Sequence, residues 1–110
     1  MTFLDERTDR ALLELRCKGV GELDVRGELD LASGPLLASS ITEHLADAHC
    51  RSVRLNLSDV KFIDCAGLGA LLQARVDAQA AGKEVVIERA GPRVREFLQR
   101  TGTVRVLLAR

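Results

Sequence analysis

The segment LNLSDVKFIDCAGLG, residues 55–69, joins a predicted strand to a predicted helix and decides the fold of this chain. Its first residues continue an alternation of apolar and polar side chains that begins at Val53, which is typical of a strand with one face against a core. Asp64 then stands at the expected N-cap of a helix, ahead of small residues. The helix carries an apolar stripe formed by Leu68, Leu72 and Val76. Free backbone N–H groups and the positive end of the helix dipole therefore gather around residues 65–67, which favours binding of an anionic group or of a partner's acceptor atoms.

Two alternating runs before this segment predict a β-hairpin. The first run contains Leu13, Leu15 and Cys17, the second contains Leu23 and Val25, and glycines 19 and 21 lie between them. A helix is then predicted from the Ser-Gly-Pro sequence at residues 33–35 to about Asp47. Its apolar stripe is formed by Leu37, Ile41, Leu45 and Ala48.

The helix after Asp64 is expected to end at Gly82, which tolerates the left-handed conformation of a C-terminal cap. A strand over residues 85–87 and a helix from Pro92 to Gly102 follow. A last strand is predicted from Val104, Val106 and Leu107.

The predicted element order is ββαβαβαβ, which belongs to the α/β class. Strands separated by helices pair in parallel, and the opening hairpin adds an antiparallel edge, so the sheet is mixed. Polar residues alternate through several strands, so one face of the sheet is expected to be less covered than the other. A single domain is expected over residues 11–108, after a loose N-terminal segment over residues 1–10.

Composition excludes several classes of partner. The chain has 110 residues, of which 16 are basic and 16 acidic, so no net field attracts nucleic acid or an anionic membrane. Three Phe and no Trp or Tyr leave no aromatic platform on which bases could stack. No apolar run approaches the roughly 20 residues of a membrane span. The N-terminus has an acidic start and no apolar signal core, so we expect a cytoplasmic protein.

The cysteines and histidines predict no metal site. Cys17, Cys50 and Cys65 have wide spacings that fit neither a disulfide framework nor a CxxC motif, so reduced thiols are expected. Cys17 is in phase with the apolar residues of the first strand, which predicts a core position. His49 and Cys50 are adjacent and His44 is near, but this set is too small for a four-coordinate zinc site.

No enzyme activity and no cofactor are expected. A catalytic Cys65 would need His44 or His49 beside it. Both histidines are expected around the C-terminal end of the first helix, whereas Cys65 is expected at the N-terminal end of the second helix, on the opposite side of the sheet's length. Gly67 and Gly69 form a GxG pair that lacks the other residues of a phosphate-binding loop. Close packing of the helix against the sheet accounts for these glycines.

The FIDCAGLG segment, residues 62–69, resembles the bacterial anti-sigma factor antagonists, which are small cytosolic proteins built from one STAS domain. The resemblance extends from the Gly-Glu-Leu-Asp turn at residues 27–30 through Pro92 to Gly102. It implies a non-enzymatic protein that binds a histidine-kinase-like, ATP-binding anti-sigma factor and thereby frees the sigma factor. The partner-binding residues that it implies are Asp30, Asp64, Cys65, Ala66, Gly67 and Leu68.

The same resemblance makes Cys65 the position at which the family carries a phosphorylated Ser. A thiol does not offer a Ser kinase its usual acceptor, and Ala66 supplies no neighbouring hydroxyl. Ser58 is near in sequence, but residues 56–59 are predicted to form a strand-to-loop turn in which its hydroxyl is bonded locally. The hypothesis is an antagonist that phosphorylation does not switch off in the usual way.

Two other interpretations remain at this point. Cys65 at a helix N-terminus, where a thiol pKa falls, is compatible with a redox-sensing variant, although Asp64 opposes the effect. Alternatively, the chain is a STAS-type interaction subunit of another assembly, such as a stress-signalling scaffold or a lipid-transport complex. For Asp64, a purely structural role as helix cap is as compatible with the sequence as a role in binding, and an Asp in the place of Asp30 is often only a turn residue.

Overall fold

A mixed four-stranded sheet forms the centre of the computed structural model, which describes residues 13–108. The strands, in spatial order, are β1 (Leu13–Gly19), β2 (Glu22–Leu29), β3 (Ser52–Ile63) and β4 (Glu84–Ala90). β1 is antiparallel to β2, and β2, β3 and β4 are parallel to one another. The predicted mixed α/β sheet is therefore confirmed, whereas the expected loose segment 1–10 lies outside the described residues.

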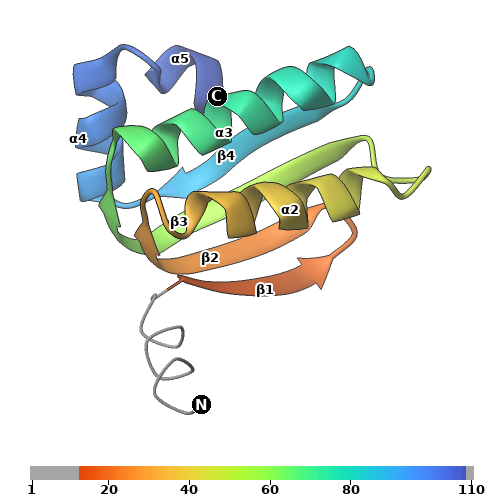
Figure 1. Ribbon diagram of the computed structural model, residues 1–110, viewed down its shortest axis with the longest axis horizontal. Coiled ribbons are helices and arrows are strands. Elements are labelled where there is room, and N and C mark those ends of the chain that lie inside the picture. Colours follow the sequence, from red (N-terminus) through yellow and green to blue (C-terminus); the bar gives the residue numbers. More distant parts are fainter. Residues whose placement is uncertain (1–12, 109–110) are drawn as a thin grey trace.

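Two long helices, α2 (Gly34–Leu45) and α3 (Cys65–Ala80), cover one face of this sheet. The shorter helices α4 (Pro92–Thr101) and α5 (Val104–Leu107) follow β4. Figure 1 shows α2 and α3 side by side above the strands, and α4 at the end of the sheet where β3 leads into α3. A proline in the first turn starts both α2 and α4, because its fixed φ suits a helix start and its missing N–H is not needed there. None of the helices within residues 13–108 is long and apolar enough to cross a bilayer.

The core lies between the sheet and the helices. Alternate residues of β3 and β4 point into it and are almost fully buried, namely Val53, Leu55, Leu57, Val85 and Ile87. The helices contribute Leu37, Ile41, Leu71 and Leu98, which are also almost fully buried. In β3 the residues between them, Arg54 and Asn56, are polar and point to the other face, whereas in β4 the intervening residue is the half-buried Val86. One face of the sheet is therefore open, as the alternation in the sequence predicted.

The predicted last strand is wrong. Residues 104–107 form the short helix α5, in which the Leu107 N–H donates to the Thr103 carbonyl oxygen at 3.1 Å. Only the next residue, Leu108, makes a single parallel bridge to Ile87 of β4. A helical turn buries Leu107 completely while Val106 stays 40% exposed. A short apolar run has no period that distinguishes this turn from a strand.

The predicted apolar stripe of α3 is wrong at Val76, whereas Leu68 is buried and Leu72 is partly buried against the core. The buried face continues through Leu71, Ala74 and Ala78, whereas Val76 is 54% exposed. Both sets have helical spacing, and the small alanines face the core because α3 packs closely against α2 and the sheet. In the same way, Ala48 lies exposed beyond the end of α2 at Leu45.

Two predictions about the strands also need correction. Cys17 is exposed rather than in the core, because β1 is the edge strand and Cys17 lines an open hollow beside Glu43 and His44 of α2. The predicted turn at Ser58 is wrong, because β3 continues to Ile63 and stays paired with β2, where Leu29 opposes Ile63. The Ser58 hydroxyl does donate locally, to the Asn56 Oδ1 at 2.7 Å.

Candidate functional site

The start of α3 lies directly beside the end of β2. Backbone atoms connect the two elements, since the Asp64 N–H donates to the Leu29 carbonyl oxygen at 3.3 Å. A β-carbon built on Gly67 would lie 2.2 Å from the same oxygen, so only glycine allows this approach. Gly67 and Leu68 are buried by this packing. The structure therefore places these two predicted site residues in the interior, where they position the surface residues.

Asp64 is the N-cap of α3, as predicted. Its backbone is extended, with φ −126° and ψ −176°, and its carboxylate accepts a hydrogen bond from the Gly67 N–H at 2.9 Å. The Leu68 N–H completes the first turn by donating to the Asp64 carbonyl oxygen at 2.9 Å. The cap satisfies one of the free N–H groups of the helix start and fixes the direction in which α3 leaves β3.

Cys65 and Ala66 follow the cap and are exposed. They are the first two residues of α3, so their side chains project from a helix turn that the Asp64 cap and the Gly67 contact hold in place. Cys65 is therefore accessible to a kinase, an oxidant or a binding partner. The helix start thus presents an exposed surface that includes Cys65 and Ala66.

Asp30 stands in the turn between β2 and α2. Its Oδ1 accepts hydrogen bonds from the N–H groups of Ala32 and Ser33, both at 3.0 Å. The Ser33 hydroxyl donates to the Glu28 carbonyl oxygen at 2.7 Å and accepts from the Asp30 N–H at 2.9 Å. The Asp30 carboxylate therefore has a structural role in this turn, and its partly exposed side chain lies next to the end of β2 that supports α3.

Ser33 is a residue whose importance the sequence analysis missed. It is only 2% exposed, and its hydroxyl connects the end of β2 to the start of α2. In the sequence, the Ser-Gly-Pro pattern at residues 33–35 indicates only a helix start. The spacing of Asp30 and Ser33, three residues apart after a strand, is typical of a turn closed by side-chain oxygens and could have indicated this role.

Exposed apolar side chains also accompany the helix starts. Leu31, in the turn before α2, is 77% exposed, and Leu36, in the first turn of α2, is 52% exposed. Phe62, at the end of β3, is 43% exposed. The starts of α2 and α3 are close together, because a β-carbon on Gly34 would lie 3.0 Å from the Ala70 β-carbon. Leu31 therefore adds exposed apolar area near the two helix starts, whereas Leu36 lies about 200° around α2 from Gly34 and faces away from α3.

The structure does not bring the histidines to Cys65. His44 lies in the last turn of α2 and His49 in the following loop. The start of α2, at the other end of that helix, is the end that lies beside the start of α3 and Cys65. His49 instead contacts Asp47, and a hydrogen bond from the His49 backbone N–H holds the pKa of the Asp47 carboxyl below its usual range. Within residues 13–108, no group of three or more His, Cys, Asp or Glu residues is arranged to hold a metal ion.

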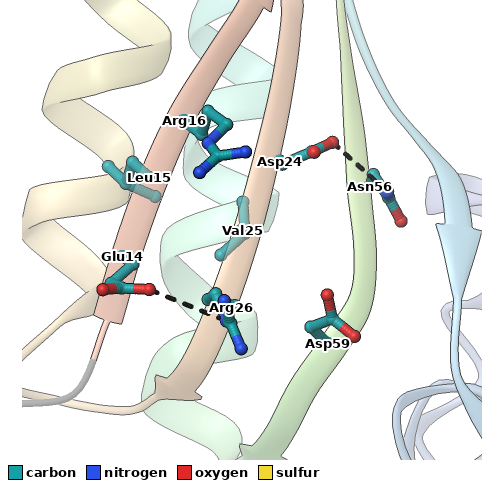
Figure 2. A pocket seen from close by; sticks show the side chains of 8 residues that line it. All are labelled: Glu14, Leu15, Arg16, Asp24, Val25, Arg26, Asn56 and Asp59. Atoms are coloured by element: carbon teal, nitrogen blue, oxygen red, sulfur yellow. Dashed lines mark hydrogen bonds and ion pairs between the residues drawn. The ribbon is translucent and has the colours of Figure 1, made fainter.

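Apart from the helix starts, a concave region lies on the open face of the sheet, with a volume of about 330 Å³. Figure 2 shows its lining side chains on β1, β2 and β3, with Glu14 directed toward Arg26 and Asp24 toward Asn56. Nearby, a hydrogen bond to Glu22 raises the pKa of Arg54 above its usual range. These charges pair across neighbouring strands, which stabilises a solvent-facing sheet surface and sets no nucleophile beside a base.

Comparisons with known proteins agree with this architecture. A profile of the STAS domain family matches residues 16–109. An anti-sigma F factor antagonist of Paenibacillus polymyxa is 24% identical over 90 residues, which are 82% of this chain and 77% of that protein. SpoIIAA, an anti-sigma factor antagonist in its unphosphorylated form, has a similar structure with a TM-score of 0.68 at 19% identity, covering 87% of this chain and 85% of its own. An anti-sigma factor antagonist from Mycobacterium paratuberculosis also gives a TM-score of 0.68, at 24% identity, over 86% of this chain and 80% of its own. Because the family match covers most of the chain, this protein belongs to the STAS domain family, as the FIDCAGLG segment predicted.

Proposed function

We propose that this protein is an anti-sigma factor antagonist, which binds a histidine-kinase-like anti-sigma factor and so frees a sigma factor. Its membership of the STAS family and its similarity to an anti-sigma F factor antagonist support the general function. The surface proposed to bind the partner consists of Asp30, Asp64, Cys65 and Ala66, which we call the α3-start surface. Gly67 and Leu68 support this surface from the interior.

The observation that carries the proposal is the exposure of Cys65 and Ala66 on a rigidly held helix start. The Asp64 cap and the approach of Gly67 to Leu29 fix this turn, so little ordering is needed when a partner binds. Leu31, which follows Asp30 directly in the chain, adds exposed apolar area next to that charged residue. An apolar patch with a polar border is typical of a protein-binding surface.

Cys65 sets the regulation that we propose. Phosphoserine at this place would add about −1.5 to −2 charges to the interface. The thiol of Cys65 lacks the hydroxyl that a Ser kinase uses, and Ala66 lacks one too. The nearby hydroxyl of Ser33 is buried, and that of Ser58 bonds to Asn56 within β3. The antagonist is therefore expected to remain active while the partner kinase has ATP.

Binding of the partner is tested with a pair of matched variants on α3. Ala66→Glu adds bulk and charge to the α3-start surface, and the helix dipole favours an acidic residue in the first turn, so the fold is retained. Ala80→Glu makes the same change at the exposed far end of α3. Titration calorimetry against the kinase-type anti-sigma factors of the same organism, with ADP or ATP present, measures both variants.

We expect Ala66→Glu to weaken binding at least about tenfold, which corresponds to about 1.4 kcal/mol, and Ala80→Glu to bind like the wild type. Equal binding by all three proteins would show that the partner binds elsewhere. No binding of the wild type to any kinase-type anti-sigma factor would contradict the proposed function and favour a STAS interaction subunit of a stress-signalling scaffold or a lipid-transport complex.

The exposure of Cys65 also supports a second candidate function, a redox-sensing variant of the antagonist. Oxidation to a sulfenic acid would add polarity to the same surface that binds the partner. A binding titration before and after treatment with hydrogen peroxide separates this candidate from a plain antagonist, because Cys65→Ala removes any effect of the oxidant at this site.

A further inference from the structure

We propose that β1 binds β1 of a second copy of this chain, so that two sheets join into one of eight strands. β1 is an edge strand, and no described residue pairs with its outer side. At the opposite edge, by contrast, Leu108 bridges to Ile87 and α5 packs against β4. The N–H and C=O groups on the outer side of β1 are thus available to a further strand, which is a recognised mode of protein association.

The side chains of β1 determine which occupant fits. Its regular part is Leu13–Cys17, because the pairing with β2 shifts between Cys17 and Gly19. Leu13, Leu15 and Cys17 share the helix-facing side, where Leu13 and Leu15 are only half-buried and Cys17 is exposed. Glu14 and Arg16 point to the open face. A partner strand must therefore offer apolar residues on one side and charges of both signs on the other.

A second copy meets this requirement when the two strands run antiparallel around a two-fold axis at Leu15. Leu15 then opposes the partner's Leu15, and each Leu13 opposes the partner's Cys17. On the open face each Glu14 opposes the partner's Arg16, and these two ion pairs are related by symmetry. Arg16 makes no ion pair with another residue in the range 13–108, so its charge is available for this contact.

Neighbouring registers are disfavoured by charge. A shift of the axis to Glu14 places two Glu14 side chains opposite each other, and a shift to Arg16 does the same with two Arg16 side chains. An axis at Cys17 sets each Arg16 against the partner's Lys18. When the axis lies between two neighbouring residues, such as Glu14 and Leu15, apolar residues lie opposite charged ones, because the side-chain period of a strand is two. The axis at Leu15 is the register in which every residue of Leu13–Cys17 has a complementary partner.

This arrangement leaves the α3-start surface open on both copies. Because the two sheets run antiparallel across the new contact, the carboxyl ends of β2 and β3 in one copy lie at the opposite end of the joined sheet from those in the other. The dimer would thus present two separate α3-start surfaces. The dimer does not depend on the proposed function, and its test measures only the association of two copies.

Cysteine cross-linking tests the register. Leu13→Cys, in a chain that also carries Cys65→Ala, places a new thiol opposite the partner's Cys17 at a separation that a disulfide can span. Residues 13 and 17 of one strand are about 13 Å apart, so they cannot bond within the same chain. Cys65→Ala alone is the control, because in this register the two Cys17 thiols are four residues apart along the strands.

We expect mild oxidation to convert the Leu13→Cys variant into a covalent dimer on a non-reducing gel and to leave the control monomeric. Cross-linking of the control to the same extent, or of neither protein, would overturn the proposed register.

Analytical ultracentrifugation measures the association itself, in chains that keep their native thiols. Arg16→Glu is compared with Arg51→Glu, which makes an equal charge change at an exposed position away from β1. Arg16→Glu is expected to raise the dimer dissociation constant about tenfold and Arg51→Glu to leave it unchanged. A wild-type chain that stays monomeric up to millimolar concentration overturns the dimer altogether.

Discussion

Gly67 of α3 lies against the carbonyl oxygen of Leu29, so close that an added β-carbon would be 2.2 Å from that oxygen. The contact fixes the start of α3 to the end of β2. It also explains why glycine stands at position 67, since a side chain there would push the helix away from the sheet. The exposed turn that carries Cys65 and Ala66 is therefore positioned by a backbone contact beneath it.

Gly67→Ala is expected to destabilise the protein strongly. The new methyl group would clash with the backbone of Leu29, which cannot move without disturbing β2, so we expect a loss of about 2–3 kcal/mol or more. Gly69→Ala is the matched control, because a β-carbon there meets no atom within 4 Å among the described residues. That variant is expected to gain about 0.5–1 kcal/mol from helix propensity. Urea unfolding measures both, and equal stability of the two variants would contradict the close approach.

Ser33→Ala is expected to loosen the turn that carries Asp30. The substitution removes the hydroxyl that serves the Glu28 carbonyl and the Asp30 N–H, at a cost of about 1–3 kcal/mol. Ser39→Ala, on the exposed side of α2, is the control and should change the free energy of unfolding by less than about 0.5 kcal/mol. The prediction fails if thermal unfolding does not separate the two variants.

Substitutions of Asp64 separate its structural role from a role in binding. Asp64→Ala removes the cap on the Gly67 N–H and should cost about 1 kcal/mol, whereas Asp64→Ser retains a capping oxygen and should cost little. If the carboxylate also contacts the partner, Asp64→Ser should bind more weakly than the wild type despite its normal stability. Wild-type affinity in that variant would limit Asp64 to its role as a helix cap.

Phosphorylation by the partner kinase is expected to fail at Cys65. Incubation with the kinase and ATP, followed by intact-mass measurement, should leave the wild type unmodified and add one phosphate to Cys65→Ser, whose hydroxyl occupies the same exposed position. Cys65→Ala is the control for any background reaction. A phosphate that appears on the wild type and is absent from Cys65→Ala would contradict the proposed regulation.

Thiol labelling tests the redox alternative. Cys17 and Cys65 are exposed and should react with a disulfide reagent without unfolding, whereas Cys50, which is 2% exposed, should react only after the protein opens. The rate at Cys65 is compared with the rate at Cys17 in single-cysteine variants. A Cys65 rate no higher than that of free cysteine removes the main support for a redox sensor.

The strand, cap and helix around Asp64 could be predicted because each depends on local chemistry. Alternation into Leu57 sets the strand, and the carboxylate at the helix start sets the cap. Residues whose environment depends on distant parts of the chain could not be predicted in this way. Cys17 is in phase with core residues, but it lies at the sheet edge, where an open hollow beside the last turn of α2 leaves it exposed. Leu107 and Val76 lie in apolar patterns whose buried face is decided by packing.

The same distinction applies to the candidate site. The sequence predicted that Asp64, Cys65 and Ala66 lie together at a helix start, which the structure shows. The role of Ser33 could also have been predicted, because its hydrogen bonds to Glu28 and Asp30 lie within one turn. The exposed Leu31 could not, because its place near the site depends on the contact between the two helix starts. That contact depends on how α2 and α3 cross the sheet, which no local pattern specifies.

Release of a sigma factor is the measurement that tests the central claim most directly. A labelled sigma factor bound to its kinase-type anti-sigma factor, with ATP present, is titrated with this protein while fluorescence anisotropy is followed. The account predicts a fall in anisotropy with the wild type and with Ala80→Glu, a much weaker effect with Ala66→Glu, and no recovery while ATP is consumed. An anisotropy that stays constant at saturating wild-type protein, for every kinase-type anti-sigma factor of the organism, would contradict the account.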